Sequence, residues 1–282
     1  MVNELTHTDA DYRAYGRAWE PFMRTVTDYT MLRRAPLQSL ITLCENTLRL
    51  DVPGAFVEAG VWRGGAGFVM AETLRRAGEA DRKVWMFDSF EGLPAPTEVD
   101  GGRAQAYIRD TTSPWYQDNC RADYDDVVAA AQRLGFTEQT RIIKGWFDIT
   151  VPAHAAAIGP IAVLRIDCDW YDPVLTCLNT LFDQVSEGGI VIIDDYFYYA
   201  GAAVAVHEFV GRRRAPYRIE TVLSDGDGRA YNEGAFLRKT ADPDQHREER
   251  VPTIGRFTTR PTQSEVSVAN LPLTHTMSEV RP

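Results

Sequence analysis

Short apolar segments alternate with amphipathic helical segments along most of this chain. The apolar segments cover residues 55–60, 83–87, 141–144, 161–166 and 190–193, and each has the length of a buried strand. Strands that alternate with helices in one chain form a parallel sheet that is covered by helices on both faces. The alternation therefore predicts an α/β fold with a doubly wound, mostly parallel sheet.

Helical spacing of apolar residues fills most of the intervals between these strands. The predicted helices cover residues 36–49, 65–77, 123–134, 174–185 and 202–212. Gly188-Gly189 is expected to end the fourth of these helices ahead of the strand 190–193. Beyond the last helix, segments 217–223 and 235–238 are expected to pair as an antiparallel hairpin around the turn-forming residues 224–228.

Three segments of different composition predict the domain organisation. Residues 1–50 are expected to form an N-terminal helical cap or lid and an oligomer contact, and residues 51–240 the core domain. Within the core, residues 91–119 are polar and too long for an ordinary connection, which is typical of a lid loop. Residues 241–282 have little periodicity and are expected to form an extended C-terminal tail. The candidates for the oligomer contact are Tyr12, Tyr15, Trp19 and Phe22.

The composition excludes several classes of protein. The chain has 40 Asp and Glu against 30 Lys and Arg, and its formal charge of -10 repels the phosphates of nucleic acids. No stretch approaches the ~20 apolar residues of a membrane span, and the N-terminus lacks a basic region followed by an apolar run. The cysteines lack metal-ligand spacing. We therefore expect a reduced, cytoplasmic protein that has no nucleic-acid or membrane partner.

A glycine-rich turn follows the first strand. Residues 56–65 run from that strand through Gly60, Gly64 and Gly65 into a helix, whose first backbone amides are free to bind a ligand. Asp88 ends the second strand, where an acid of a doubly wound sheet is placed to hold a pair of ribose hydroxyls. The dinucleotide fingerprint G-x-G-x-x-G is missing. This favours a nucleoside without a pyrophosphate, and S-adenosylmethionine is the commonest such cofactor.

Two features each have two interpretations. Glu58, an acid within the apolar first strand, either forms a salt bridge with Arg63 or contacts the amino-acid portion of the cofactor. A group of aromatic residues either lines an acceptor pocket or forms the core beneath a lid. Its members are Trp115, Tyr116, Tyr196, Phe197, Tyr198 and Tyr199. His207, in the last predicted helix, is expected to be a packing or surface residue rather than a base.

Two neighbouring strands of the predicted sheet end in acids. Asp167 and Asp169 follow the fourth strand, and Asp194-Asp195 follows the fifth. Ligands bind beyond the carboxyl ends of parallel strands, so these carboxylates are expected to converge in one pocket. Their mutual repulsion is relieved by a hard divalent cation, with Mg2+ favoured. Asp167 and Asp169 point to opposite sides of an extended chain, which predicts that one binds metal while the other faces a substrate hydroxyl.

Together these segments resemble the macrocin O-methyltransferase (TylF-type) family of metal-dependent sugar O-methyltransferases in natural-product pathways. The resemblance runs from about Asp28 to Lys239. Cys168 departs from the glycine that is usual between the two acids, and it leaves both carboxylates in place. The motifs that carry the resemblance are Asp28-Tyr29-Thr30-Met31, residues 56–65, Phe87-Asp88-Ser89-Phe90-Glu91-Gly92-Leu93-Pro94, Lys144-Gly145-Trp146-Phe147, Asp167-Cys168-Asp169-Trp170-Tyr171 and Ile193-Asp194-Asp195-Tyr196.

The resemblance implies the class I methyltransferase fold, a Rossmann-like, seven-stranded sheet with an antiparallel final hairpin. It implies that Asp167, Asp194 and Asp195 bind Mg2+ and that Asp169 is the catalytic general base. A homo-oligomer, either a dimer or a tetramer, is the assembly that it suggests. The implied cofactor-binding residues are Thr30, Met31, Glu58, Gly60, Arg63, Gly64, Asp88, Ser89, Gly145, Trp146 and Phe147.

We therefore expect an O-methyltransferase that uses S-adenosylmethionine and Mg2+ and releases S-adenosylhomocysteine. Its expected acceptor is a sugar hydroxyl of a glycosylated small molecule, in a pathway of antibiotic biosynthesis. One alternative is a Mg2+-dependent methyltransferase of a catechol-like or other small-molecule hydroxyl, and another is a non-catalytic protein that binds S-adenosylmethionine. The missing dinucleotide fingerprint argues against an NAD-linked oxidoreductase.

Overall fold

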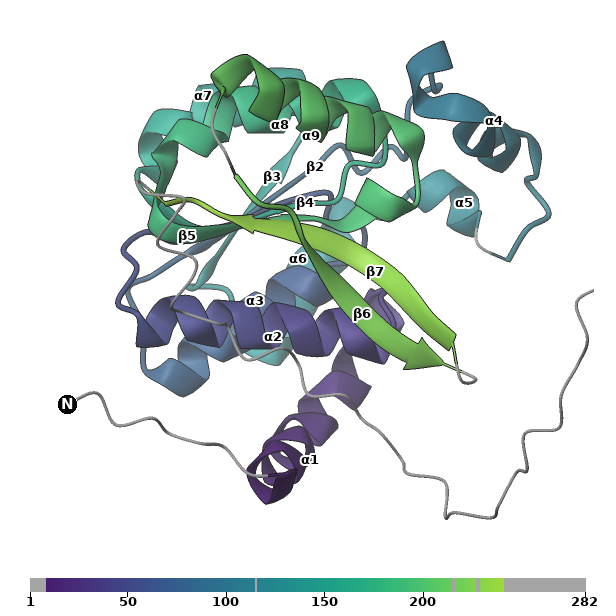
Figure 1. The fold of residues 1–282 in the computed structure, drawn as a ribbon. Coiled ribbons are helices and arrows are strands. Elements are labelled where there is room, and N and C mark those ends of the chain that lie inside the picture. Colours follow the sequence, from purple (N-terminus) through teal and green to yellow (C-terminus); the bar gives the residue numbers. More distant parts are fainter. Residues whose placement is uncertain (1–8, 115, 215–216, 227–228, 241–282) are drawn as a thin grey trace, which may run out of the picture. The chain divides into compact units, whose positions relative to one another are not determined.

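One mixed sheet organises the chain, and the computed structural model describes residues 9–114, 116–214, 217–226 and 229–240 (Figure 1). The strands are β1 (Ala55–Ala59), β2 (Val84–Asp88), β3 (Thr140–Lys144), β4 (Ile161–Ile166), β5 (Val185–Ile193), β6 (Glu220–Gly226) and β7 (Arg229–Arg238). Their order is β3-β2-β1-β4-β5-β7-β6, with β1 to β5 parallel and β7 antiparallel to both of its neighbours. This confirms the predicted doubly wound seven-stranded sheet and its antiparallel final hairpin.

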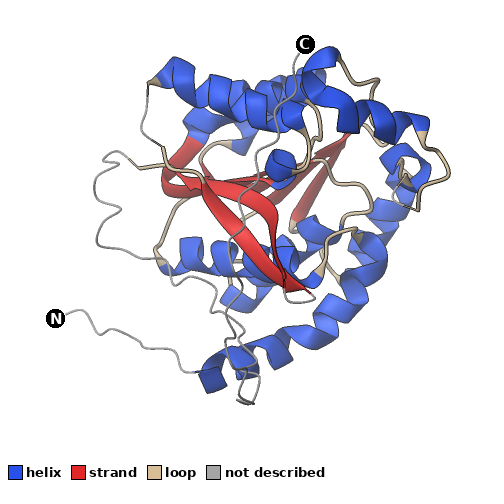
Figure 2. Cartoon of the chain, turned by 45° about the vertical axis from the view of Figure 1, so that its right-hand side comes forward, coloured by secondary structure: helices blue, strands red, loops and turns tan. Residues whose placement is uncertain are grey.

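Helices cover both faces of this sheet (Figures 1 and 2). The elements labelled as helices in the described residues are α1 (Asp9–Val26), α2 (Arg34–Arg49), α3 (Gly65–Ala77), α4 (Gly101–Arg109), α5 (Gln117–Cys120), α6 (Tyr124–Leu134), α7 (Phe147–Ile158), α8 (Tyr171–Leu181) and α9 (Ala200–Arg213), of which α4 and α5 lie to the side of the sheet. A hydrophobic core lies on each face of the sheet. One core contains side chains of α1, α2, α3 and α6, and the other contains side chains of α7, α8 and α9. Successive strand residues alternate between these cores, as Phe56 and Val57 do on β1, because side chains of a strand alternate in direction.

The predicted lid segment 91–119 is partly helical. The turn Glu98–Asp100 and α4 occupy its middle. The Asp100 carboxylate accepts hydrogen bonds from the Thr97 backbone N–H (2.7 Å) and the Thr97 hydroxyl (3.0 Å), which fixes the turn that leads into α4. Gln117–Cys120 forms a left-handed turn, with φ between 44° and 57°. The segment is therefore not a continuous loop. The hydrogen bonds between Thr97 and Asp100 start a helix that the spacing of apolar residues does not predict.

The predicted helix 174–185 is wrong at its end. α8 stops at Leu181, a single 3-10 turn follows, and β5 begins at Val185. β5 then passes through Gly188 and Gly189, which exchange backbone hydrogen bonds with Lys239 (2.7 and 2.8 Å). Gly188 has φ of 80°, so the pair bends a strand instead of ending a helix.

Helix α7 has no counterpart in the sequence prediction. Pro152 lies inside it and lacks the N–H that an interior helical residue donates. Alanines after the proline favour the helix, which continues to Ile158. The loss of one hydrogen bond is therefore tolerated.

Helix α1 packs against the chain's own core. Trp19 is 2% exposed, and its ring meets Phe22 edge-on with 6.2 Å between centroids. The ring of Phe22 meets Phe136 in the same way. Trp19 is therefore not available to a partner chain, while the oligomer contact itself stays a prediction. The predicted tail 241–282 and residues 1–8 lie outside the described residues, and no helix among the described residues is long and apolar enough to span a membrane.

Candidate active site

A cavity of about 710 Å³ lies at the carboxyl ends of the parallel strands. Residues at the ends of β1, β2, β4 and β5 contribute to its lining, as expected for the ligand site of an open α/β sheet. The predicted site residues found in this lining are Thr30, Met31, Glu58, Gly60, Asp88, Ser89, Trp146, Phe147, Asp167, Asp169, Asp194 and Asp195. The structure thus brings segments of very different sequence position to one cavity.

Three predicted cofactor residues do not line the cavity. The guanidinium of Arg63 lies 4.4 Å from the ring centroid of Trp62. Gly64 has φ of 97°, and a Cβ there would come within 2.6 Å of the Phe68 ring. Gly145 has φ of 143° and donates its N–H to the Asp88 carbonyl at 2.8 Å. These residues shape the turns around the cavity, and their part in cofactor binding stays a prediction.

The glycine turn after β1 packs directly on the end of β4. Gly60 has φ of 92°, and a Cβ at this position would lie 1.7 Å from the Asp167 carbonyl oxygen. The Asp167 N–H donates to the Ala59 carbonyl at 2.8 Å, which closes the contact. Only glycine fits here, because any side chain would push the turn away from the acidic end of β4.

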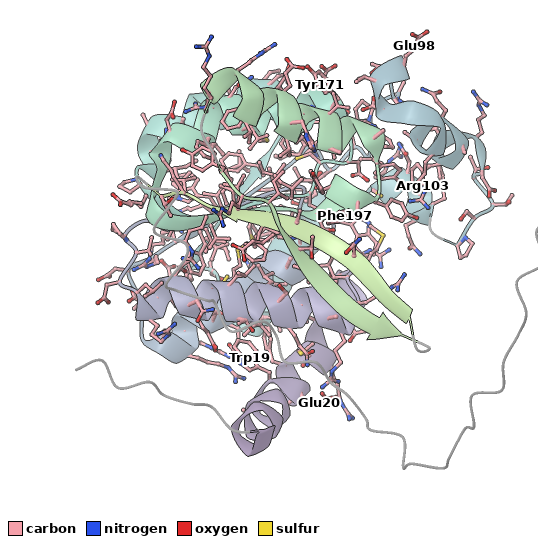
Figure 3. The ribbon with its side chains drawn as sticks, viewed as in Figure 1. Trp19, Glu20, Glu98, Arg103, Tyr171 and Phe197 are labelled. Atoms are coloured by element: carbon pink, nitrogen blue, oxygen red, sulfur yellow. The ribbon has the colours of Figure 1, made fainter. Side chains whose placement is uncertain are left out.

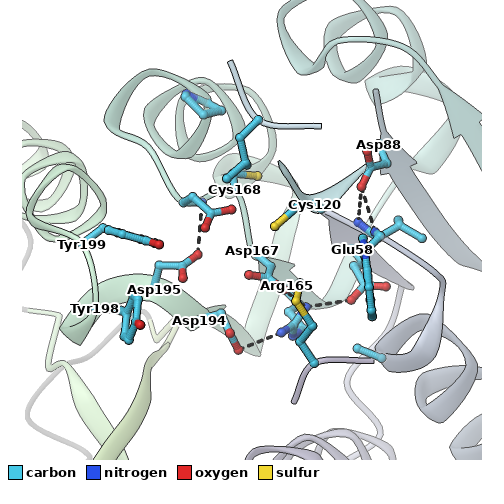
Figure 4. Close-up of a pocket in the computed structure, with 18 of the residues that line it drawn as sticks. Glu58, Asp88, Cys120, Arg165, Asp167, Cys168, Asp194, Asp195, Tyr198 and Tyr199 are labelled. Carbon is cyan, nitrogen blue, oxygen red and sulfur yellow. Dashed lines mark hydrogen bonds and ion pairs between the residues drawn. The ribbon is translucent and has the colours of Figure 1, made fainter. Parts of the chain in front are cut away.

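Asp88 organises the backbone of this turn. Its Oδ2 accepts hydrogen bonds from the N–H groups of Val61 (2.7 Å) and Trp62 (2.9 Å) (Figure 4). Its Oδ1 accepts one from the N–H of Phe90 (2.7 Å). Burial raises the pKa of Asp88, and the three backbone donors oppose that rise. The Asp88 carboxylate thus binds the chain's own amides at the edge of the cavity, and its role in holding ribose hydroxyls stays a prediction.

Glu58 forms a buried ion pair with Arg165, and not with Arg63. The two side chains are 1% and 2% exposed, and Glu58 Oε1 lies 2.8 Å from an Arg165 nitrogen. Oε2 of Glu58 is buried without a hydrogen-bond partner. Burial raises the pKa of Glu58 to about 8, although Arg165 acts to lower it. An unpartnered buried acceptor at the wall of a cavity is suited to a ligand that brings a donor.

Arg165 also holds two of the predicted metal ligands. Its guanidinium lies 2.9 Å from Asp167 Oδ2 and 2.7 Å from Asp194 Oδ1 (Figure 4). One buried cation thus joins three carboxylates from β1, from the end of β4 and from the end of β5. No sequence pattern predicted this role. The available signal was an arginine inside the otherwise apolar strand 161–166.

The predicted acid cluster is present at the centre of the cavity. Asp167, Asp194 and Asp195 each offer a carboxylate oxygen, and these oxygens lie within 4.8 Å of one another. The backbone N–H of Asp169, which has φ of 60°, donates to Asp195 Oδ2 at 3.1 Å. Burial, followed by the charges of neighbouring aspartates, raises the pKa of both Asp169 and Asp195. A set of crowded carboxylate oxygens fits a hard divalent cation.

Aromatic side chains form the opposite end of the cavity from Glu58. In Figure 4, Tyr198 and Tyr199 lie beyond Asp195, on the side away from Glu58 and Asp88. Tyr198 is 53% exposed, and the guanidinium of Arg103 on α4 lies 4.2 Å from its ring centroid. Arg103 and the nearby Phe197 are labelled in Figure 3. The residues of this aromatic end are Arg103, Tyr107, Phe197, Tyr198 and Tyr199.

The remaining predicted aromatic residues do not contribute to this end. Trp115 lies outside the described residues. Tyr116 and Tyr196 are not part of the cavity lining. The hydroxyl of Tyr196 instead shares a hydrogen bond of 2.7 Å with His207 Nε2, and the two rings stack. His207 is exposed and lies outside the cavity lining, which fits the expected surface residue.

Comparison with known proteins decides the family. The family described as Macrocin-O-methyltransferase (TylF) matches residues 1–231. The chain belongs to this macrocin O-methyltransferase family. It is an O-methyltransferase, and the structure shows its class I methyltransferase fold.

Curated relatives and a solved structure agree with this assignment. The chain is 38% identical over 234 residues to the 8-demethyl-8-(2,3-dimethoxy-alpha-L-rhamnosyl)-tetracenomycin-C 4'-O-methyltransferase of Streptomyces olivaceus, with 83% of this chain and 82% of that protein covered. It is 34% identical to the demethyldecarbamoylnovobiocin O-methyltransferase of Streptomyces niveus, with 79% and 82% covered. The solved structure of the O-methyltransferase NovP superposes with a TM-score of 0.63 at 32% identity, covering 75% of this chain and 82% of that one.

The buried Glu58 is expected to make the stability of this methyltransferase depend on pH. Its folded-state pKa of about 8 exceeds the ordinary value of 4.5, so between these pH values the folded chain keeps a proton that the unfolded chain has released. The free energy of unfolding therefore falls as pH rises through this window, by at most about 1.4 kcal/mol per pH unit for one proton.

Urea denaturation of the wild type and of Glu58→Gln across this pH window measures the effect. The advantage of the wild type over Glu58→Gln should shrink steadily as pH rises. The exposed Glu138→Gln serves as the control and should follow the wild type throughout. Parallel stability curves for the wild type and Glu58→Gln would show that Glu58 does not hold the proton.

Proposed function

We propose that this enzyme transfers the methyl group of S-adenosylmethionine to a sugar hydroxyl of a glycosylated natural product, with Mg2+ as its metal. The observation that carries the proposal is the convergence of four aspartates between two differently lined ends of one cavity. The rhamnosyl group in the name of the Streptomyces olivaceus relative supports a sugar as the acceptor. The enzyme accordingly belongs to antibiotic-type biosynthesis, and S-adenosylhomocysteine is its second product.

The end of the cavity that contains Glu58 receives the cofactor. The unpartnered Oε2 of Glu58 suits the ammonium group of the methionine portion, because a positive charge at this position lowers the raised pKa of Glu58 and stabilises its ionised form. Gly60 allows close backbone approach, and Thr30, Met31, Ser89, Trp146 and Phe147 complete the lining. When bound, the cofactor supplies a reactive methyl group on its sulfonium.

The three clustered aspartates hold the cation. Asp167, Asp194 and Asp195 present oxygen ligands of the type that Mg2+ prefers. When bound, the cation supplies a Lewis acid that lowers the pKa of a substrate hydroxyl beside it. Arg165 orients Asp167 and Asp194 by ion pairs and compensates part of their charge. These two carboxylates are therefore held in position before the cation binds.

Asp169 acts as the general base. It lines the cavity but lies outside the three-residue ligand cluster, and its backbone is tied to Asp195. Its raised pKa makes it a stronger proton acceptor than an exposed aspartate. Asp169 accepts the hydroxyl proton as the substrate oxygen attacks the methyl carbon. The exposed ring of Tyr198 provides a stacking surface for the acceptor.

Methyl transfer to a panel of deoxysugar glycosides, with Mg2+ and with EDTA, tests the proposal. We expect turnover with Mg2+ and a loss of about two to three orders of magnitude with EDTA, restored when Mg2+ is added back. Calorimetric titration of S-adenosylmethionine is the parallel measurement. A simple catechol is the control acceptor and should be methylated poorly. Turnover of the catechol alone would overturn the sugar assignment, and unchanged turnover in EDTA would overturn the metal assignment.

A further inference from the structure

Asp100 is a buried acid that the proposed chemistry does not use. It ends the turn before α4, is 1% exposed and does not belong to the cavity lining. A buried carboxylate is costly unless hydrogen bonds compensate for the lost water. Its bonding partners therefore indicate why an acid occupies this position.

The carboxylate of Asp100 joins two segments that are far apart in sequence. Oδ1 accepts a hydrogen bond of 2.7 Å from the backbone N–H of Tyr171, the first residue of α8. Oδ2 accepts from the N–H and the hydroxyl of Thr97. The acid thus sits at the positive N-terminal end of α8, where a negative charge is stabilised.

The backbone of α9 packs tightly against the hydrogen bond between Asp100 and Tyr171. Gly201 of α9 approaches so closely that a Cβ there would lie 2.1 Å from Asp100 Oδ1 and 2.9 Å from the Tyr171 nitrogen. A second tie runs parallel to the first, because the indole N–H of Trp170 donates to the Pro94 carbonyl at 3.0 Å. Residues 94–100 therefore bind the start of α8 through two hydrogen bonds.

Trp170 and Tyr171, which donate these two hydrogen bonds, directly follow Asp169. Asp169 holds a left-handed conformation, with φ of 60°, which is strained for a non-glycine residue and persists only where neighbours enforce it. On the other side of Asp100, α4 begins at the next residue and carries Arg103 and Tyr107 into the cavity lining. Asp100 therefore lies between Asp169, the proposed base, and α4, which forms the part of the cavity wall proposed to face the acceptor (the acceptor wall).

We propose that Asp100 is a positioning residue that fixes Asp169 relative to the acceptor wall formed by α4. This inference rests on the proposed role of Asp169 as the base. Asp100 itself touches neither substrate nor cofactor. Its effect on the reaction passes through the backbone of residues 169–171, so loosening it displaces the base from the hydroxyl that it serves.

Asp100→Asn, compared with Thr97→Val, is the first test. Thr97→Val removes only the hydroxyl bond and leaves the Tyr171 contact, so it controls for loosening of the turn itself. We expect kcat to fall by about 10²-fold in Asp100→Asn, the loss typical of a displaced catalytic group, with cofactor affinity unchanged. Thr97→Val should stay near the wild type. Equal losses in the two variants would overturn the proposal.

A double-mutant cycle with Asp169→Asn shows whether Asp100 acts through the base. Residues that act as one unit give non-additive losses, so Asp100→Asn should lower kcat little further once Asp169 is replaced. Full additivity of the two losses would mean that Asp100 acts by another route, and would overturn the proposal.

Hydrogen–deuterium exchange gives a readout that does not depend on turnover. The amides at the start of α8 should exchange faster in Asp100→Asn than in Thr97→Val, because only the first change removes the negative charge from the group that accepts the Tyr171 N–H. Unchanged exchange in Asp100→Asn would overturn the positioning role whatever the reaction is. Failure of wild-type methyl transfer would instead count against the proposed function, so the two failures are distinguishable.

Discussion

Replacement of Asp169 by asparagine is expected to lower kcat by about 10²–10⁴-fold, the range for loss of a general base. Asparagine keeps the size of the side chain and the backbone N–H that donates to Asp195, so the geometry of the loop should survive. What it removes is the proton acceptor. Asp169 lies outside the Asp167, Asp194 and Asp195 cluster, so the affinities for S-adenosylmethionine and for Mg2+ should stay close to those of the wild type.

Steady-state kinetics and calorimetric titration separate these effects. The exposed Asp81 lies outside the cavity lining, and Asp81→Asn is the isosteric control for the loss of one carboxylate charge. It should leave kcat largely unchanged. If Asp169→Asn keeps full turnover, Asp169 is not the base. If it loses cofactor or metal affinity in proportion to kcat, its role is in binding and not in proton transfer.

The strands and their terminal acids could be predicted because both signals are local. An apolar run followed by aspartate, as at Asp167 and Asp194, indicates a strand and its carboxyl end, and parallel strands bring those ends together. The convergence of the acids then follows from topology alone. No detailed side-chain geometry was needed to predict it.

The role of Arg165 depends on register, which the sequence does not display. Glu58 and Arg165 are direct partners across β1 and β4, so the pair exists only in the observed alignment of those strands. The bonds of Asp88 depend in the same way on the conformation of the glycine turn, which places the amides of Val61 and Trp62 at its carboxylate. Asp100 lay in a polar segment without periodicity, where no local pattern indicates burial.

Arg165→Met is expected to cause the largest loss of stability of any change considered for this protein. Arg165 is 2% exposed and pairs with Glu58, Asp167 and Asp194. Methionine fills much of its volume but leaves those carboxylates without their cation, and breaking a buried ion pair from one side costs about 3–5 kcal/mol. Urea denaturation measures the loss, with Arg212→Met as the control. Arg212 forms an exposed pair with Glu208, so its loss should cost about 0.5 kcal/mol or less.

Two further measurements separate charge compensation from packing in Arg165→Met. Mg2+ should raise the free energy of unfolding more in this variant than in the wild type, because a bound cation replaces part of the charge that Arg165 supplied. Asp167→Asn combined with Arg165→Met should be less destabilised than Arg165→Met alone, since the double change removes one of the carboxylates that Arg165 compensates. Equal losses in the single and double variants, with no added benefit from Mg2+, would assign the role of Arg165 to packing. Recovery in both measurements would mean that Arg165 compensates the acidic cluster electrostatically in the absence of metal.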